Sequence, residues 1–348
     1  MVLALVFAGM ACTPEENGGN GGNKENQENK ENEKPQPVLV TGITLDGTSL
    51  SVLVGESATL AATVAPGNAD NKKIAWSSSD ESVAKVDANG VVKAVAKGKA
   101  DIVASSSDGS SVTAKCAVVV SNPCPEGAID LGLTNPDGFR FYFATSNLSM
   151  KGLCADPMEP GDYFAWGETE PYYISQNPLV WKEGKSQGYM WPSYKWFIDY
   201  TSTHEAILSK YCWKKLPDLW GGSGEPDGKT VLDPEDDAAH IILGGNWRIP
   251  TNQEFTILKE TCECRMAEEN GIKGMRVNAP NGKSYFFAAS GRLYGDEYLD
   301  PRSDVHYWTA DLSTGTQMAS SFAANSSAIS TKTFTTRFMG LAIRPVSD

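Results

Sequence analysis

The residues best suited to binding chemistry are the aromatic and acidic side chains of residues 163–220. Aromatic faces stack on the apolar faces of sugar rings, and a carboxylate such as Glu168 can accept hydrogen bonds from hydroxyl groups. This run contains six of the nine tryptophans, namely Trp166, Trp181, Trp191, Trp196, Trp213 and Trp220. Aromatic side chains also anchor long loops on themselves, and we favour that interpretation for most of the run. The sequence leaves Trp166, Glu168, Tyr172 and Trp308 as candidate ligand-binding residues.

A second group with chemical potential is the acidic segment formed by Asp233, Glu235, Asp236 and Asp237. Carboxylate oxygens are the ligands that calcium prefers. Their spacing is not that of an EF-hand, and N-capping of a helix together with its dipole explains acids at this place. We therefore predict no metal site and no cofactor.

The histidines belong to no recognisable catalytic motif. His204, His240 and His306 stand outside any nucleophile elbow or H-E-x-x-H pair, and neither a phosphate loop nor a dinucleotide fingerprint occurs. Paired carboxylates for glycoside hydrolysis stay open, because their spacing of roughly 5–10 Å is spatial. The sequence predicts a protein that is not an enzyme and has no catalytic residues.

The charge of the chain excludes two classes of direct partner. The formal net charge is −13 at pH 7, and most of the acidity lies in residues 125–348. Nucleic acid and anionic lipid surfaces both attract basic proteins. We therefore expect no nucleic-acid partner, and membrane contact only through a covalent lipid.

The N-terminal segment has the features of an export signal. Residues 2–10 are almost unbroken apolar chain, a small residue follows, and Cys12 comes next. The run is about half as long as a membrane span needs. It resembles the lipobox of bacterial lipoproteins, which implies a signal over residues 1–12, lipidation of Cys12 and an outer-membrane address that Glu15 and Glu16 also favour. An ordinary cleaved signal is the alternative, and the lack of a basic residue before the run places the expected start codon upstream.

The segment behind Cys12 is expected to be a disordered tether. Residues 13–37 contain Asn, Glu, Gly, Lys, Gln and Pro in large number and no hydrophobic residue. Such a composition cannot bury enough apolar surface to offset chain entropy. A flexible coil of this length spans roughly 25–30 Å, enough to lift a folded domain from a membrane.

Six cysteines remain beyond Cys12, an even number that suits an oxidising cell envelope. Cys262 and Cys264 are poor partners for each other, because residues two apart at a helix end point in different directions. We expect one or two disulfides and some buried free thiols.

Residues 38–122 read as a β-sandwich of short strands. Alternation over residues 58–64 gives one apolar face, and the Asn89-Gly90 pair predicts a hairpin turn between residues 83–86 and 91–95. The segment resembles the bacterial Ig-like domain of group 2, through GITL at 42–45, VGE at 54–56, LAATVAP at 60–66, WSSSD at 76–80, VAKVD at 83–87, GVVKA at 90–94 and GKADI at 98–102. The resemblance implies a spacer or adhesive module with Trp76 in its core.

Residues 125–348 alternate strands, helices and long loops, which indicates an α+β domain. Phe139, Phe141 and Phe143 alternate with other residues along one predicted strand. Caps predict one helix from Asp233 to residue 243 and another that begins at the capping box of Thr251 and ends near residue 262. Further strands are expected at residues 285–288, 307–310, 320–323 and 341–344.

This segment resembles the Fibrobacter succinogenes major paralogous domain group, lipoprotein modules related to the C-type lectin fold. The signatures are IDLGL at 129–133, GDYFAWGE at 161–168, DAAH at 237–240, GNWRIPT at 245–251 with Glu254, YWT at 307–309 and GLAIRPV at 340–346. The resemblance implies a C-type lectin-like α+β domain. The calcium and sugar motifs of animal C-type lectins do not occur here, so calcium-dependent sugar binding is not implied. Arg248 and Arg344 are expected to form internal salt bridges.

Together these features predict a surface-anchored lipoprotein with a flexible tether, an Ig-like spacer and a lectin-like head that binds a glycan or a surface protein. The alternatives are a structural subunit of a surface filament or, less favoured, an enzyme that acts on polysaccharide.

Overall fold

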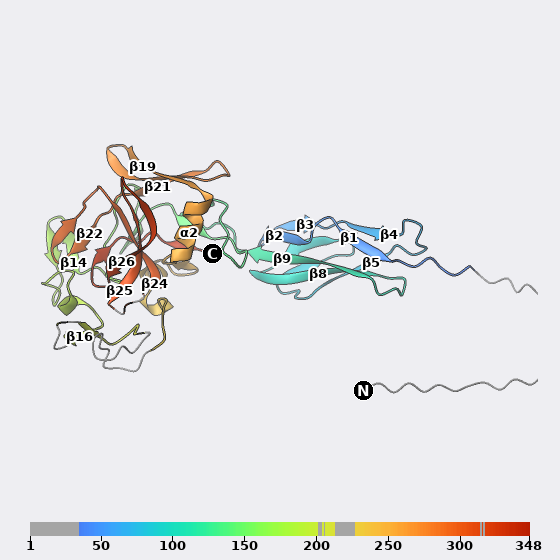
Figure 1. Ribbon diagram of the computed structural model, residues 1–348, viewed down its shortest axis with the longest axis horizontal. Helices are drawn as coiled ribbons and strands as arrows, with labels where there is room; N and C mark the ends of the chain where they lie inside the picture. Colours follow the sequence, from blue (N-terminus) through green and yellow to red (C-terminus); the bar gives the residue numbers. More distant parts are fainter. Residues whose placement is uncertain (1–34, 201–203, 205, 213–226, 314, 316) are drawn as a thin grey trace, which may run out of the picture.

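The computed structural model describes residues 35–200, 204, 206–212, 227–313, 315 and 317–348. These residues form an N-terminal domain (35–122) and a larger head (125–348), which lie end to end (Figure 1). The predictions for the signal, Cys12 and most of the tether fall outside the described residues, as do those for Trp213 and Trp220. Among the described residues, no helix has the length and apolar content needed to cross a membrane.

The N-terminal domain is a sandwich of antiparallel and parallel strands. Its strands are β1 (Gly42–Leu45), β2 (Ser49–Leu53), β3 (Ser57–Thr59), β4 (Ala62–Ala65), β5 (Ile74–Ser78), β6 (Ala84–Val86), β7 (Val91–Ala94), β8 (Gly98–Ser106) and β9 (Thr113–Ser121). One sheet has the order β2-β9-β8-β5, with β2 parallel to β9, and a second has the order β3-β7-β6. Buried Val, Ile, Leu and Ala side chains fill the space between the sheets.

The hairpin between β6 and β7 confirms the turn expected from Asn89-Gly90. Gly90 has a φ of 78°, and a Cβ there would lie 2.4 Å from the Leu60 carbonyl oxygen and 2.9 Å from the Trp76 ring. Glycine is therefore required both by the backbone conformation and by the close approach of the Trp76 ring. Trp76 is partly buried and packs against the core, so it lies at the border of the core where it was predicted.

The single strand expected over residues 58–64 is divided in two. Strand β3 pairs with β7, whereas β4 pairs with β1, so the chain changes partner strands at Leu60. The predicted alternation survives the break, because Leu60 is buried while Thr59 and Ala61 are exposed. Periodicity therefore located the buried face but not the change of pairing.

In the described part of the head, strand residues far outnumber helical residues. Its strands are β10 (Ala128–Ile129), β11 (Tyr142–Ala144), β12 (Leu148–Ser149), β13 (Gly152–Leu153), β14 (Tyr173–Gln176), β15 (Leu179–Trp181), β16 (Phe197–Tyr200), β17 (Ala206–Leu208), β18 (Trp247–Arg248), β19 (Glu263–Glu269), β20 (Ile272–Asn278), β21 (Ser284–Ala288), β22 (Arg292–Tyr294), β23 (Glu297–Leu299), β24 (Val305–Leu312), β25 (Met318–Ala324), β26 (Ile329–Thr336), β27 (Gly340–Leu341) and β28 (Val346–Ser347). Its helices are η1 (Trp191–Ser193), η2 (Pro234–Asp236), α1 (Ala238–Leu243) and α2 (Asn252–Thr261).

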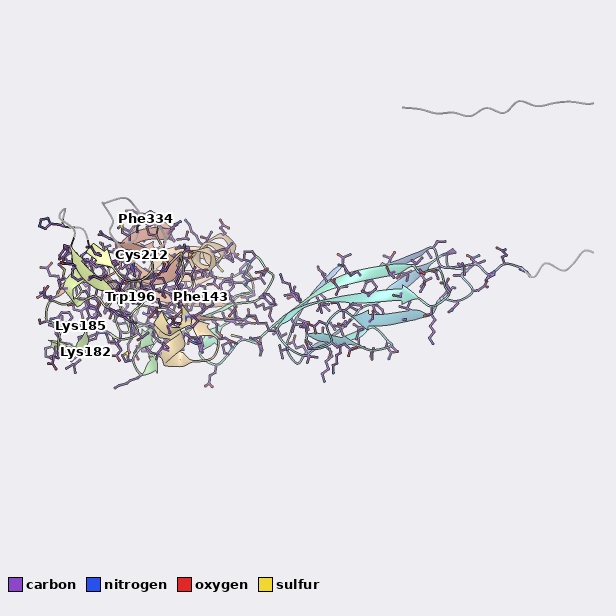
Figure 2. All side chains as sticks on the ribbon, turned by 90° about the horizontal axis from the view of Figure 1, so that it is seen from below. Phe143, Lys182, Lys185, Trp196, Cys212 and Phe334 are labelled. Carbon is purple, nitrogen blue, oxygen red and sulfur yellow. The ribbon has the colours of Figure 1, made fainter. Side chains whose placement is uncertain are left out.

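Several small sheets build the head. The orders are β10-β11-β28-β18, β19-β20-β21, β23-β22-β27 and β24-β25-β26, with two-stranded pairs β12-β13, β14-β15 and β16-β17. Two buried clusters form its core, one around Trp166 and Trp308 and the other around Phe255 and Phe287. Figure 2 shows Lys182 and Lys185 toward the end of the head that lies away from the N-terminal domain.

The helix caps confirm one prediction and correct another. Thr251 and Glu254 form the expected capping box of α2, and Cys262 is its C-cap. Helix α1, in contrast, begins directly after Asp237. This residue is the N-cap, and its Oδ1 accepts hydrogen bonds from the backbone N–H groups of Ala239 and His240. Asp233 instead precedes the short 3₁₀-helix η2 and makes no side-chain cap, so the predicted start of the helix at Asp233 was wrong, whereas its predicted end at residue 243 is confirmed.

Two predictions about cross-links are also corrected. All six cysteines in the described part of the chain are free, so none of the one or two expected disulfides forms there.

Arg248 forms the expected internal ion pair, with Glu254. Arg344 is fully buried, but its guanidinium donates to the Asn147 side chain at 2.7 Å and to the Thr145 carbonyl at 2.8 Å instead of to a carboxylate.

A polar junction joins the two domains. The Lys97 ammonium lies 2.9 Å from an Asp348 carboxylate oxygen and 5.3 Å from the centre of the Phe139 ring. The Asn122 side chain donates to the backbone carbonyl of Asp348 at 2.9 Å. The Tyr142 hydroxyl donates to the Asn122 carbonyl at 2.8 Å, and Tyr142 is buried. These contacts hold the last strand of the head against the end of the N-terminal domain.

Candidate functional site

The structure brings the candidate residues Trp166, Glu168 and Tyr172 together with Trp308, and it buries all four. Trp166 and Trp308 have no exposed surface, Tyr172 is 1% exposed and Glu168 is 8% exposed. An indole ring without exposed surface has no free face for a sugar to stack on. Burial therefore favours a structural role for these side chains, and their role in ligand binding stays a prediction.

The two indoles cross-link segments that are far apart in the sequence. The Trp166 Nε1–H donates to the Thr309 carbonyl at 2.8 Å, and the Trp308 Nε1–H donates to the Phe164 carbonyl at 2.6 Å. Leu341 pairs with Phe164 in an isolated bridge. The signatures GDYFAWGE, YWT and GLAIRPV thus meet in one core, where they hold the fold.

Glu168 is satisfied by groups within the protein. Its Oε1 accepts hydrogen bonds from the Tyr172 hydroxyl and from the Lys195 backbone N–H at 2.7 Å, and its Oε2 lies 3.4 Å from the Lys185 ammonium. That ammonium also lies 3.9 Å from the centre of the Tyr172 ring. Burial, followed by the Glu168 carboxylate, raises the pKa of Tyr172 well above its usual value, so the phenol stays a donor.

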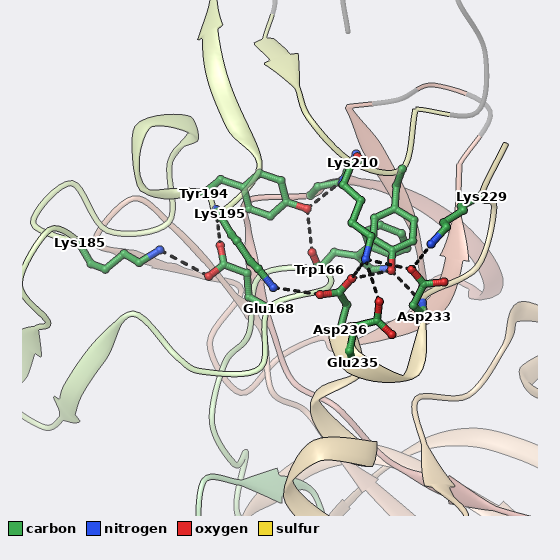
Figure 3. A network of polar contacts seen from close by, with 12 residues as sticks. Trp166, Glu168, Lys185, Tyr194, Lys195, Lys210, Lys229, Asp233, Glu235 and Asp236 are labelled. Atoms are coloured by element: carbon green, nitrogen blue, oxygen red, sulfur yellow. Dashed lines mark hydrogen bonds and ion pairs between the residues drawn. The ribbon is translucent and has the colours of Figure 1, made fainter. Parts of the chain in front are cut away.

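Next to Glu168 lies a cluster of carboxylates and lysines (Figure 3). Asp236 is 3% exposed. Its carboxylate forms an ion pair with the Lys195 ammonium at 2.9 Å and a second ion pair with the Lys210 ammonium. Asp233 pairs with Lys210 at 2.9 Å. Burial opposes the charged form of Asp236, but the hydrogen bonds from Lys210 and Lys195 outweigh it and lower the pKa of this carboxyl.

Lysine side chains also neutralise the acidic segment that the sequence offered as a possible calcium site. Ligand oxygens of Asp233, Glu235 and Asp236 lie within 4.8 Å of one another. Ammonium groups already balance them, because Lys210 contacts all three carboxylates. A cation here would have to displace Lys210, so the geometry favours an internal ion-pair network.

The head also has an open cavity of about 410 Å³, which the sequence did not predict. Its lining residues are Met158, Pro160, Tyr163, Gln176, Asn177, Ile272, Ala289, Ser290, Tyr298, Pro301 and Arg302. Strands β14, β20 and β23 contribute Gln176, Ile272 and Tyr298 to its lining, and β14 lies on the side of the head away from the N-terminal domain (Figure 1). Its volume falls in the range usual for small-ligand sites, about 300–1,000 Å³.

Aromatic and amide groups face this cavity. The rings of Tyr163 and Tyr298 meet edge to face with centroids 5.7 Å apart. Tyr163 forms the floor, because it is 3% exposed and its hydroxyl donates to the Ser290 carbonyl, whereas Tyr298 is 37% exposed. Gln176 donates through Nε2 to the Gly161 carbonyl at 2.9 Å. The cavity thus combines one accessible aromatic ring with fixed polar groups.

Sequence reasoning missed these residues because they come from separate stretches of chain. Only Tyr163, Gln176 and Asn177 fall within the aromatic run at 163–220. Ile272, Tyr298 and Arg302 follow about a hundred residues later, without a local motif. Only the tertiary structure brings the loop before β14, the start of β20 and the β22–β23 hairpin together around the cavity.

Comparison with known proteins identifies the N-terminal domain. Residues 39–117 match the family model of the bacterial Ig-like domain, group 2. This segment is a bacterial Ig-like domain. The match confirms the resemblance drawn from the sequence. The four-stranded and three-stranded sheets of the N-terminal domain agree with an Ig-like sandwich.

Curated relatives share only a minor part of the chain. An uncharacterised protein of Clostridium acetobutylicum is 43% identical over 84 residues, which are 24% of this chain and 9% of that protein. An Ig-like virion protein of Serratia phage KSP90 is 45% identical over 24% of this chain and 33% of its own length. An alpha-L-arabinofuranosidase of Bifidobacterium longum is 44% identical over 20% of this chain and 7% of its own length. The chain therefore spans at most about a third of these relatives, and the glycosidase matches fall in the Ig-like region.

Among solved structures, domains 4 and 5 of the S-layer protein SbsC are 24% identical over 24% of this chain and 53% of that chain, with a TM-score of 0.21. Domains 5 and 6 of the same protein are 10% identical over 89% of this chain and 98% of that chain, with a TM-score of 0.22. Scores this low add nothing to the assignment of the head.

Proposed function

We propose that this protein is a surface-anchored lipoprotein whose lectin-like head binds a carbohydrate in the cavity beside Tyr298. The observation that carries the proposal is the cavity itself, which is open, lies on the side of the head away from the Ig-like domain and contains an exposed aromatic ring. Six sequence signatures support a C-type lectin-like head. The Ig-like domain, which this chain shares with a virion protein, fits a surface or structural role as a spacer.

The anchor and the tether complete this arrangement. Lipid on Cys12 would fix the chain to the outer membrane, and residues 13–37 would raise the folded part above it. Labelling of cells with an alkyne fatty acid tests this part of the proposal. We expect label on the wild-type protein and none on a Cys12→Ala variant, and equal labelling of both would contradict the anchor.

A sugar suits the chemistry of the cavity better than a charged or wholly apolar ligand. The Tyr298 ring can stack on the apolar face of a pyranose, while Gln176, Asn177 and Arg302 offer groups that hydrogen-bond to hydroxyls. The lining residues include no carboxylate or histidine. Hydrolysis of a glycoside ordinarily uses two carboxylates, so we propose binding without turnover.

A glycan array with the purified full chain, run in calcium and again in chelator, tests the function. We expect saturable binding that weakens at least 10-fold, or about 1.4 kcal/mol, in Tyr298→Ala, because the substitution removes the aromatic face on which the sugar stacks. Tyr294→Ala is the matched control, since Tyr294 lies on the same hairpin, is 44% exposed and does not line the cavity.

The outcomes separate the candidate functions. A folded chain that binds no glycan would overturn the proposal, and assembly into filaments or capture of a surface protein would then assign a structural or protein-binding role. Glycan binding that survives Tyr298→Ala but is lost in Trp166→Ala would place the site at the residues chosen from the sequence. Release of reducing sugar would assign an enzyme.

A further inference from the structure

A second group of polar side chains lies beside the cavity, on the loop between β23 and β24 and at the start of β24. Asp300 follows β23, Asp304 precedes β24, and His306 lies on β24 opposite Ala323 of β25. One carboxylate oxygen of each aspartate and one ring nitrogen of His306 all lie within 4.8 Å of one another. Three potential metal ligands therefore converge on one point.

The histidine of this group is buried without hydrogen-bond partners. His306 is 7% exposed, and among the described residues neither Nδ1 nor Nε2 has a partner. A buried polar atom without a partner costs about 1–3 kcal/mol, so native proteins ordinarily supply water or an ion at such places. Both ring nitrogens of His306 are therefore available to a ligand.

The charges around the imidazole favour a cation. The Arg292 guanidinium lies 3.3 Å from one oxygen of Asp300. The Asn325 side chain donates to one oxygen of Asp304 at 3.3 Å. Two carboxylates against one guanidinium leave a net negative charge beside the imidazole.

We propose that Asp300, Asp304 and His306 bind one divalent transition-metal ion, with Zn²⁺ as the probe. Calcium and magnesium prefer oxygen ligands alone, whereas zinc and related ions accept imidazole nitrogen together with carboxylate oxygen. In a tetrahedral zinc site with bonds of about 2.0–2.2 Å, the ligand atoms are roughly 3.3–3.6 Å apart, so the three groups, now within 4.8 Å of one another, would move together by up to about 1.5 Å around the ion.

The ion would also stabilise one wall of the cavity. Pro301 and Arg302 line the cavity and lie between the two aspartate ligands. Binding at Asp300 and Asp304 would fix this loop against β24. The metal site is independent of the carbohydrate proposal, since zinc binding is measured without a glycan.

The other acidic group of the head serves as the internal comparison. Its members Asp233, Glu235 and Asp236 converge to the same extent as the ligands of the proposed site. They contain no imidazole, and Lys210 contacts all three. A Glu235→Gln variant therefore changes an acidic cluster without touching the proposed ligands.

Zinc binding by the chelator-treated full chain tests the proposal, by equilibrium dialysis with metal analysis and by titration calorimetry. We expect one Zn²⁺ per chain, bound at least 10-fold more weakly in Asp304→Asn and His306→Gln and unchanged in Glu235→Gln. If removal of the buried His306 unfolds the head, Asp300→Asn decides the question, because that aspartate side chain is 42% exposed. A cobalt spectrum without the intense thiolate band separates this site from one made by free cysteines.

Three results would overturn the proposal. A folded wild-type chain that binds no Zn²⁺ would leave water as the partner of His306. Equal affinity in Asp304→Asn, or a thiolate band in the cobalt spectrum, would place the metal elsewhere. Glycan binding at Tyr298 is measured in a separate experiment, so failure of the metal site and failure of the carbohydrate site are distinguishable.

Discussion

Removal of the Asp236 carboxylate is the sharpest test of the ion-pair network. Asp236→Asn keeps the shape of the side chain but removes the charge that balances Lys195 and Lys210, and it weakens the hydrogen bond from the Tyr211 hydroxyl, now 2.8 Å long. Loss of one partner of a buried ion pair costs about 3–5 kcal/mol. Because the lysine side chains are 46% and 24% exposed, solvent screening reduces this value, and we expect about 2–3 kcal/mol.

Urea unfolding followed by tryptophan fluorescence measures this change in the head, since Trp76 is the one tryptophan of residues 38–122. Glu235→Gln is the control, because its side chain is 67% exposed and should change the free energy of unfolding by less than about 0.5 kcal/mol. A loss below about 0.5 kcal/mol in Asp236→Asn would refute the reasoning.

The pH dependence of the difference in unfolding free energy between the wild type and Asp236→Asn gives a second test of the ion-pair network. Hydrogen bonds from Lys210 and Lys195 overcome the effect of burial and lower the pKa of Asp236 in the folded state. The stabilisation is therefore present in full above the unfolded pKa, near 3.9, and is lost as the pH falls through the lower folded pKa. We expect the wild type and Asp236→Asn to converge in stability only in that acidic range, and a constant difference down to the lowest pH would contradict the assignment.

Three further predictions follow from single contacts. Thr251→Ala removes the capping box of α2 and should cost about 1 kcal/mol, which lowers the melting temperature of the head by roughly 2–4 °C in calorimetry. Gly90→Ala places a Cβ 2.4 Å from the Leu60 carbonyl oxygen at positive φ, so the Ig-like domain should lose more than about 1 kcal/mol, seen by circular dichroism. Lys97→Glu opposes Asp348 with a like charge and should weaken the junction by about 1 kcal/mol, so that small-angle scattering shows a broader range of domain orientations. Unchanged melting, unchanged circular dichroism and unchanged scattering, respectively, would contradict them.

Local signals were sufficient for several elements. The Asn89-Gly90 turn and the Thr251 capping box depend on residues within a few positions of each other, and both were predicted correctly. The match of residues 39–117 to the Ig-like family was also readable from short motifs. The predicted helix start at Asp233 was wrong because Asp237 offers a better cap, with two backbone donors and a third from Ile249 across the chain.

Burial and convergence, in contrast, were decided by the tertiary structure. Trp166 and Trp308 looked suited to a ligand, but each indole donates to a backbone carbonyl 143 or 144 residues away and is enclosed there. Tyr298 and His306 gave no signal in the sequence, since their neighbours come from strands that only the fold brings together. Composition and local motifs thus determined the order of domains and the likeness of the first one to a family. Which side chains meet, and which face a ligand, depends on long-range packing that no local pattern encodes.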